Sequence, residues 1–467
     1  MDINTSFDSL KKEHQLNFYP TLDERRRVLS VLKKALQQDA KLLVAAVNKD
    51  YRHRSEEETL FLEIFPTIRS IEYCLKNTGQ WMKKKRRDVS WLLAPAKAYT
   101  LPQPLGIVGN MVPWNYPVYL ALVPAIYALA AGNRVLIKMS ELSTQTGLAL
   151  QSLIKKHHLE QFIQVINGDV EVAQKFAALP FGHLIFTGST KVGKMVMKAA
   201  SEQLTPVTLE LGGKSPAILS SSMNSQYFNR LFMGKMFNAA QTCIAPDYLL
   251  VPTGWDKKIE EEFNRCVASY FPNLMKNNDY SNIISTHHKE RLLAMLEDAK
   301  AKGARIVTFG EQDNRSNKMP LYLLFNVTKD MAVMQEEIFG PLLPVVEYKT
   351  IKEAISFVNE LPNPLALYYF GEDKEEQELL LTDTLSGAFT VNETLMHIAV
   401  DDLPFGGVGN SGMGHYHGKE GFDTFSKLKP VFIQSKFATV SWLYPPYGRF
   451  LKLVLSWIGG IKLGKQK

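Results

Sequence analysis

The chain has 467 residues, of which 45% are hydrophobic and 22% charged, as in globular proteins of two or three domains. Its 54 Lys and Arg against 47 Asp and Glu give a net charge of +7, too small an excess to indicate nucleic-acid binding. The densest basic run, Lys83–Arg87, is better explained as a solvated face. No nucleic-acid partner is therefore expected.

The three cysteines cannot all pair and show no CxxC spacing, which favours a reducing compartment and argues against a structural zinc site. His415 and His417 have no partner cluster, so no metal is expected. The first residues lack a charged-then-apolar signal pattern, and a cytoplasmic location is the expectation.

The first 75 residues predict helices that lie over a core. Apolar residues recur at three- and four-residue intervals from Arg25 to Val47 and again from Glu56 to Leu75. The basic run follows, and then a Pro-punctuated segment, Trp91–Leu105, with short strand-like pieces. We interpret this segment as an arm that crosses away from the body.

From Gly106 the pattern alternates between strands and helices. The predicted strands are 106–109, 134–138, 162–166 and 183–186, and the predicted helices are 118–131, 144–157, 170–178 and 194–200. The first of these helices is too short and too Pro-interrupted for a membrane span, so we expect it to be buried. The alternation predicts a parallel sheet with helices on both faces, an α/β Rossmann-like fold that binds nucleotides at its strand carboxyl ends.

A second α/β unit is expected between about residues 212 and 399. Its predicted strands are 217–219, 248–251, 305–308 and 343–346, with helices over 255–271, 286–302 and 350–361. A glycine-rich run, Pro404–Gly414, then leads the chain back to the body.

Cys243 and Glu210 are the strongest candidates for chemistry. The thiol lies in Asn238-Ala-Ala-Gln-Thr-Cys243-Ile-Ala-Pro246, a loop suited to presenting a side chain into a cleft. A β-rich run delivers Glu210 into the turn Gly212-Gly213, where the carboxylate could activate the thiol or a water molecule. The alternative is that Cys243 is a small buried hydrophobe, as most lone cysteines are.

Two strand ends carry candidate nucleotide contacts. Gly188, Ser189 and Gly193 open a helix after a strand, where backbone N–H groups can approach an anion. Lys138 and Glu141 follow another strand, where an acidic residue can hold ribose hydroxyls. The alternatives are a tight turn without a ligand and a solvent-facing strand cap.

Three further residues are candidates by position. Asn115 lies between prolines, so its rigid amide could stabilise an oxyanion, or it could be a turn asparagine. Glu337 and Phe339 share a loop. They could bind a ribose and a planar ring, or be a loop carboxylate beside a core aromatic ring.

Taken together, these segments resemble the aldehyde dehydrogenase superfamily over about the first 435 residues. The motifs are Pro113-Trp-Asn115, Lys138-Met-Ser-Glu141, Phe186-Thr-Gly-Ser-Thr190, Leu209-Glu-Leu-Gly-Gly-Lys214, Gln241-Thr-Cys243 and Glu336-Glu-Ile-Phe-Gly-Pro341. The finer resemblance is to the class 3 branch, which includes fatty and coniferyl aldehyde dehydrogenases. It is carried by Cys243-Ile-Ala-Pro-Asp-Tyr248, Leu403–Gly409, Ser411–Gly418 and the closing Tyr444-Pro-Pro-Tyr-Gly448.

Three positions depart from the family pattern. The family usually has glycine where this chain has Ala240 and proline where it has Met139. It usually has Val-Asn-Asp where this chain has Val391-Asn-Glu393. A methyl group at Ala240 is expected to restrict the thiol loop.

The resemblance implies NAD(P)-dependent oxidation of an aromatic or aliphatic aldehyde to the acid. Cys243 would attack the carbonyl, Asn115 would stabilise the oxyanion, and Glu210 would activate the water that hydrolyses the thioester. The cofactor would be NAD, with NADP as an alternative, held by Lys138, Glu141, Gly188, Ser189, Gly193, Glu337 and Phe339. The alternatives are a CoA-acylating or reductive enzyme on the same fold, which a hydrolytic Glu210 disfavours, and a non-catalytic nucleotide-binding protein.

The expected domains are a nucleotide-binding domain (1–82 and 103–211), a catalytic domain (212–399), arm elements (83–102 and 400–435) that suit a homodimer, and a tail (436–467). The tail is rich in apolar residues from Phe450 to Leu463, and basic residues are interspersed among them as far as Lys467. Lys452 and Gly459-Gly460 interrupt the apolar run, so it has too few consecutive apolar residues for a membrane span. Either it packs across the substrate entrance or a neighbouring subunit, or it lies in a bilayer interface.

Overall fold

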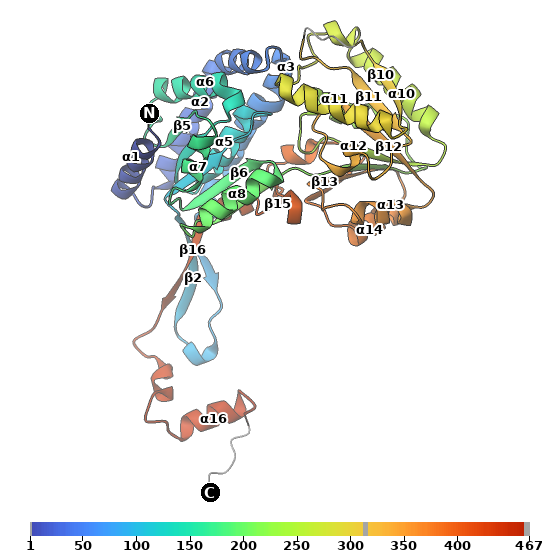
Figure 1. The fold of residues 1–467 in the computed structure, drawn as a ribbon. Coiled ribbons are helices and arrows are strands. Elements are labelled where there is room, and N and C mark those ends of the chain that lie inside the picture. The colour runs from blue at the N-terminus through green and yellow to red at the C-terminus, as the bar shows by residue number, and fades with distance from the viewer. Residues whose placement is uncertain (1, 312–315, 462–467) are drawn as a thin grey trace.

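The computed structural model describes residues 2–311 and 316–461, and it contains three β-sheets (Figure 1). Two large sheets, each flanked by helices, form the body. The third sheet forms a narrow stalk that projects from it. The tail positions Lys462, Leu463, Lys465 and Lys467 lie outside the described residues.

The first large sheet is the predicted Rossmann-like one. Its order is β15-β7-β6-β3-β4-β5, and all pairs are parallel except β15 with β7. The strands are β3 (Ile107–Met111), β4 (Arg134–Lys138), β5 (Ile163–Ile166), β6 (His183–Gly188), β7 (Val207–Leu211) and β15 (Gly412–Met413). These runs are almost continuously buried, as expected for a parallel sheet covered on both faces.

Helices cover this sheet. They are α1 (Ile3–Leu16), α2 (Leu22–Tyr51), α4 (Phe65–Trp81), α5 (Pro117–Ala130), α6 (Thr144–Lys156), α7 (Val170–Ala177) and α8 (Thr190–Ser201). Every residue of α5 is buried, because α5 lies between the sheet and the helices α2 and α4. Helix α8 begins four residues earlier than predicted, since Ser189 caps it by accepting a hydrogen bond from the Val192 N–H at 3.4 Å.

The second large sheet has the order β10-β11-β12-β9-β8-β13-β14, parallel except for the edge strand β10. Its strands are β8 (Pro216–Leu219), β9 (Tyr248–Pro252), β10 (Arg305–Phe309), β11 (Leu321–Phe325), β12 (Leu342–Tyr348), β13 (Ala366–Phe370) and β14 (Ala388–Val391). Its covering helices include α9 (Tyr227–Met236), α10 (Asp256–Tyr270), α11 (Thr286–Ala301), α13 (Ile351–Asn359) and α14 (Lys374–Asp383).

The stalk joins two distant parts of the chain. Strand β2 (Lys97–Pro104) pairs antiparallel with β1 (Lys85–Arg87) on one side and with β16 (Ser426–Ile433) on the other. The short helices η2 (Trp91–Leu93), η8 (Thr439–Leu443) and α16 (Arg449–Trp457) lie at its far end (Figure 1).

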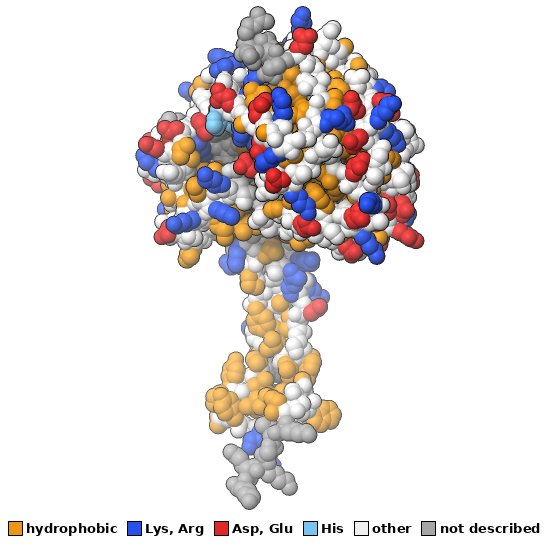
Figure 2. Space-filling view, turned by 45° about the vertical axis from the view of Figure 1, so that its right-hand side comes forward, with side chains coloured by type: hydrophobic (Ala, Val, Ile, Leu, Met, Phe, Trp, Pro, Cys, Tyr) orange, Lys and Arg blue, Asp and Glu red, His pale blue; other side chains and the backbone are white. Residues whose placement is uncertain are grey.

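The tail does not lie across the substrate entrance of its own chain. Helix α16 has no buried residue, contacts η8, and lies beyond the stalk, away from the body. That part of the tail prediction is therefore wrong: the long antiparallel pair β2–β16 carries the tail outward. Apolar side chains gather around the lower stalk and its tip (Figure 2). Within the described residues, no helix is both long and apolar enough to cross a membrane.

Candidate active site

One cavity brings together the three residues predicted to carry chemistry. Cys243, Glu210 and Asn115 all line a cavity of about 360 Å³ between the two large sheets and α4. Its remaining lining is mostly apolar and aromatic: Phe61, Leu62, Phe65, Pro66, Tyr116, Tyr119, Leu120, Ile244, Leu365, Leu395, Met396, Ile398, Phe405 and Tyr416. This size and lining suit a small apolar ligand with a few convergent polar groups.

The thiol loop is held in a strained conformation. After α9 the residues Asn238, Ala239 and Ala240 all adopt left-handed backbone angles, with φ of 51°, 49° and 61°. Buried Gln241 fixes the loop, since its side-chain amide donates to the carbonyls of Asn238 at 2.9 Å and Asn282 at 3.0 Å. The loop therefore presents the next residues, including Cys243, at a defined place.

The Cys243 thiol is half-buried and not paired with another cysteine. Burial raises its pKa to about 12, and the nearby carboxyl groups of Glu337 and Glu210 add to this shift. A thiol in this state needs a proton acceptor or an added positive charge before it becomes a nucleophile.

Glu210 lies near the carboxyl end of β7, opposite Thr187 of β6. The residue is 2% exposed, and neither carboxyl oxygen has a hydrogen-bond partner among the described residues. Burial raises its pKa well above the ordinary value. A carboxyl group left without a partner in a cavity is suited to hold and deprotonate a water molecule.

Asn115 is fixed from both its backbone and its side chain. Its Nδ2 donates to the Gln241 carbonyl at 3.1 Å, which leaves one amide hydrogen for another acceptor. Its own carbonyl accepts hydrogen bonds from the Tyr51 hydroxyl at 2.9 Å, Arg54 at 3.1 Å and the Asn238 amide at 3.0 Å. The oxyanion candidate and the thiol loop are thus tied to the same buried groups.

The two predicted nucleotide-contact segments lie at the carboxyl edge of the first sheet. Strands β4 and β6 flank β3, so Lys138 at the end of β4 and Ser189 after β6 lie at one edge. The chain order reverses beside β3, the position at which such sheets bind nucleotides. Gly193 permits close packing of α8, because a Cβ there would lie 2.7 Å from Leu211 Cδ2.

The residues at this edge fit a dinucleotide. Lys138 is buried, its pKa is lowered by burial, and its nearest carboxylate is Glu141 at 3.9 Å. The Glu141 side chain is half exposed, and both contacts with the described residues, from Lys138 and from the Ser140 hydroxyl at 3.5 Å, are made to its Oε2. Helix α8 presents its N-terminus, with Gly188 directly before the cap, to a phosphate.

Lys214 and Asp247 hold the loop that contains Glu337 and Phe339. The Lys214 ammonium contacts Asp247 at 2.5 Å and the Glu336 carbonyl at 3.0 Å, while Asp247 accepts the Ile338 N–H at 3.0 Å. Burial raises the pKa of Glu337 to about 8. Its carboxylate lies over a glycine, because a Cβ on Gly212 would be 1.9 Å from Glu337 Oε2.

Comparison with known proteins identifies the family. Residues 12–431 match the model of the aldehyde dehydrogenase family. A probable coniferyl aldehyde dehydrogenase of Pseudomonas aeruginosa is 49% identical over 93% of this chain and 91% of its own length. Aldehyde dehydrogenase family 3 member A2 of Pongo abelii is 40% identical, covering 88% of this chain and 84% of its own. The substrate-bound structure of Staphylococcus aureus AldH superposes with a TM-score of 0.93 at 37% identity, over 98% of this chain and 100% of that chain.

The chain belongs to the aldehyde dehydrogenase family. It is an NAD(P)-dependent enzyme that oxidises an aldehyde, and the resemblance to the class 3 branch is confirmed.

Some residues of the dehydrogenase site escaped the sequence reasoning. Tyr416 lines the cavity with its hydroxyl buried and without a partner among the described residues. The Tyr116 hydroxyl lies 2.7 Å from the Thr242 hydroxyl, beside the thiol. Tyr416 belongs to the segment Ser411–Gly418 that carries the family resemblance, but neither tyrosine has a role predicted from the sequence, and the fold brings both to the cavity.

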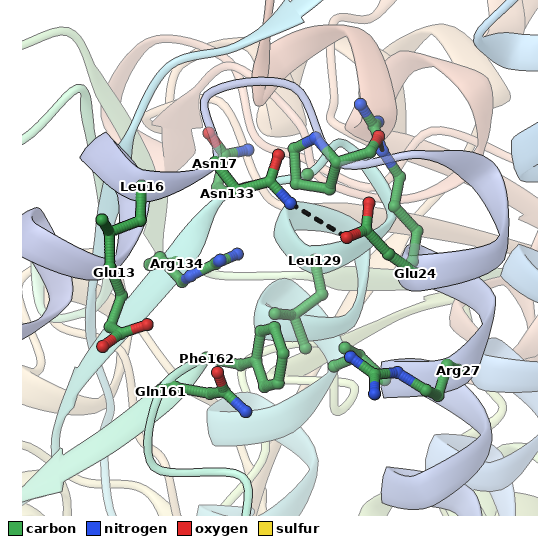
Figure 3. A pocket seen from close by; sticks show the side chains of 14 residues that line it. Glu13, Leu16, Asn17, Glu24, Arg27, Leu129, Asn133, Arg134, Gln161 and Phe162 are labelled. Carbon is green, nitrogen blue, oxygen red and sulfur yellow. Dashed lines mark hydrogen bonds between the residues drawn. The ribbon is translucent and has the colours of Figure 1, made fainter.

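A second cavity of this dehydrogenase, about 130 Å³, lies between α1, α2 and the start of β4 (Figure 3). Charged side chains of both signs, among them Glu13, Glu24, Arg27 and Arg134, line it, and the Asn17 amide donates to Glu24 at 3.1 Å. It shares no lining residue with the thiol cavity, and Arg134 begins β4 at the opposite edge of the sheet from Lys138.

Proposed function

We propose that this dehydrogenase oxidises an aromatic aldehyde of the coniferyl kind, with Cys243 as nucleophile, Asn115 in the oxyanion site and Glu210 as general base. The observation that carries the proposal is their convergence on one cavity lined by aromatic rings. The names of the relatives in Pseudomonas support the choice of substrate.

In the first half of the reaction, the Cys243 sulfur attacks the aldehyde carbon as a thiolate. The negative charge that develops on the carbonyl oxygen is stabilised by the free amide hydrogen of Asn115 and by the Cys243 backbone N–H. Because Asn115 is already held by Gln241 and by the groups on its carbonyl, little reorganisation is needed.

Lys138, Glu141, Gly188, Ser189, Gly193, Glu337 and Phe339 would hold the cofactor. When bound, NAD accepts the hydride that leaves the substrate carbon, so that a thioester remains on Cys243. Glu141 would bind the ribose hydroxyls and repel a 2′-phosphate, and we therefore expect a lower KM for NAD than for NADP. A lower KM for NADP would contradict this assignment.

In the second half, Glu210 takes a proton from water, which attacks the thioester carbon and releases the acid. Among the described residues no group hydrogen-bonds to this carboxyl, so its oxygens are available to a water molecule. A CoA-acylating enzyme has no use for such a base.

The test is NADH formation with a panel of aldehydes by the wild type and two serine variants. Cys243→Ser should remove nearly all activity, because a hydroxyl has no comparable nucleophilicity. The matched control is Cys266→Ser, since that thiol is buried in α10 and contacts Asn229 Oδ1 at 3.3 Å. Full activity of Cys243→Ser would overturn the mechanism.

We also propose the division into a nucleotide-binding domain (1–82 and 103–211), a catalytic domain (212–399) and arm elements (83–102 and 400–435), with the arm as the surface of a homodimer. Leu428, Phe432 and Ile433 of β16 are exposed apolar residues that support it. The unpaired Cys74, buried in α4, agrees with a reducing compartment such as the cytoplasm.

A further inference from the structure

The thiol cavity has a polar group in its lining that the chemistry of aldehyde oxidation does not use. Asp401, in the loop between β14 and β15, lines the cavity together with Cys243. It is the acidic residue besides Glu210 among the described residues of the lining. An acid in an apolar cavity calls for a partner, because its burial is otherwise unfavourable.

The solvent exposure of the lining residues distinguishes an inner end of the cavity from its mouth. The inner residues are Asn115, Glu210 and Tyr416, which are 3%, 2% and 0% exposed. The outer residues lie one helical turn apart on α4: Phe65 is 58% exposed, and the side chain of Arg69 is 57% exposed. Asp401 is partly exposed, unlike the inner residues, and its partner Ser70 lies on α4, the helix that carries the outer residues; Asp401 therefore lies nearer the mouth than Asn115, Glu210 and Tyr416 do.

Asp401 is held in place but not saturated. Its Oδ1 accepts a hydrogen bond from the Ser70 hydroxyl at 2.8 Å, and its backbone carbonyl accepts one from the Tyr127 hydroxyl at 3.3 Å. No hydrogen bond to Oδ2 is formed by the described residues. The nearby cation Arg69 pairs with Glu72 at 2.6 Å.

The neighbouring aspartate is used differently. Asp402 accepts a hydrogen bond from the Tyr73 hydroxyl and does not line the cavity. The two adjacent carboxylates therefore have the same chemistry and different surroundings, and only Asp401 can meet a molecule inside the cavity.

We propose that Asp401 accepts a hydrogen bond from a hydroxyl group at the far end of the substrate, and that the enzyme thereby selects aldehydes with a distal phenolic hydroxyl. This inference rests on the proposed function, because it requires the aldehyde carbon at Cys243. The aromatic lining between the two ends, including Tyr119 and Phe405, suits the ring that would join them.

Buried polar groups need hydrogen-bond partners, and this need determines which substrates Asp401 favours. Burial raises the pKa of Asp401, since its carboxylate is partly desolvated. A substrate hydroxyl supplies a donor to Oδ2, whereas an analogue without the hydroxyl covers the carboxylate and leaves Oδ2 without a donor. The contact is made equally in the bound state and the transition state, so it should act mainly on KM.

The experiment compares three substrates that differ at one position: 4-hydroxycinnamaldehyde, 4-methoxycinnamaldehyde and cinnamaldehyde. For the wild type we expect kcat/KM to be about tenfold or more higher for the hydroxylated substrate than for the other two. In Asp401→Ala this ratio should fall to near one. In Asp401→Asn, which keeps an oxygen for Ser70 but turns an amide toward the substrate, the order should shift in favour of the methoxy compound.

Asp402→Ala is the matched control, and it should keep the wild-type ratio. Equal kcat/KM for all three substrates in the wild type, or an unchanged ratio in both Asp401 variants, would overturn the proposal while leaving the oxidation of aldehydes intact. If the wild type oxidised none of the three, the proposed function itself would fail. Turnover of cinnamaldehyde by each variant reports that it is folded, and Asp401→Asn serves if Asp401→Ala does not fold.

Discussion

At the scale of single residues, the protonation of Glu210 and Cys243 bears on both halves of the proposed reaction. Glu210 and Cys243 both lie in the same cavity, and burial raises the pKa of each. Protonated forms are therefore favoured in the protein alone, and proton transfer must accompany both halves of the reaction. Deletion of the two groups should nevertheless have different kinetic consequences.

Glu210→Gln should slow turnover by about 10²- to 10⁴-fold while a burst of NADH persists, because the thioester still forms but water is no longer activated. Since the pKa of Glu210 is raised, its ionised fraction grows with increasing pH, and the steady-state rate of the wild type should rise with pH. The variant should lose that part of the pH dependence. Rapid-mixing absorbance measurements over a pH series test this.

The matched control is Glu336→Gln, an exposed carboxyl group next to Glu337 in the loop with Phe339. Loss of the burst together with turnover in Glu210→Gln would assign Glu210 to the attack by Cys243 instead.

Ala240 is a second residue whose local conformation matters. Its φ of 61° lies in the left-handed region, where a Cβ costs about 1 kcal/mol relative to glycine. Ala240→Gly should therefore raise the free energy of unfolding by about 0.5–1 kcal/mol, as glycine relaxes the turn. Ala240→Val, with a branched side chain, should lower it. Thermal unfolding of the three proteins tests the order Gly, Ala, Val, and an equal Tm for all three would show that the turn holds no strain.

At the scale of elements, a buried charge network joins the N-terminal helices to the site. Arg54, fully buried after α2, contacts Glu63 at 2.9 Å and Glu58 at 3.5 Å. Glu63 also accepts the N–H groups at the start of α5, and Glu58 accepts the Asn238 N–H at 2.9 Å. One cation thus connects the start of α5, Asn115 and the thiol loop.

Arg54→Met should lower the free energy of unfolding by about 3–5 kcal/mol, because two buried carboxylates lose their partner. It should also lower kcat, since the Asn115 carbonyl loses a donor. Chemical denaturation together with steady-state kinetics measures both effects. Lys33→Met is the control: its partly exposed pair with Glu72, at 2.7 Å, should contribute about 0–1 kcal/mol. A stability equal to that of the wild type would show that Arg54 does not carry the network.

The elements that sequence patterns predicted are those with a strong local signal. The strands at 134–138 and 183–186 and the buried helix at 118–131 occur within one or two residues of the prediction. The strands β11, β13 and β14 were not anticipated. Both β11 and β13 are wholly buried, and such apolar runs do not alternate.

The same limit applies to the site. Cys243, Glu210 and Asn115 are recognisable because each lies in a short motif that matches a known family. Arg54 acts through a contact with Asn115, which is far away in the sequence, and no spacing encodes that contact. The role of Arg54 follows only from the packing of the residues after α2 against the start of α5.

At the scale of the whole molecule, the stalk presents a surface that the chain itself does not cover. Phe437, Trp442 and Trp457, which follow β16 in the chain, are 85%, 64% and 88% exposed. Exposed aromatic groups of this kind mark a contact with another protein or with a membrane. A single chain in water would leave this surface unpaired.

Truncation after Tyr447 distinguishes the two partners of the tail. Helix α16 places Phe450, Leu453 and Trp457 on exposed positions, with Arg449 and Lys452 nearby. Packing on a second copy of the chain predicts that the intact protein is a dimer which stays in solution with anionic liposomes. On that basis, the truncated protein should dissociate more readily in size-exclusion chromatography at low concentration.

A bilayer interface predicts instead that the intact protein sediments with anionic liposomes and the truncated one does not, since apolar residues would insert while basic residues face the lipid charges. We expect the first result, because the tail continues from β16, an edge strand of the sheet that we propose as the dimer surface. If the intact protein sediments with the liposomes and the truncated protein does not, packing on a neighbouring subunit is not the whole role of the tail.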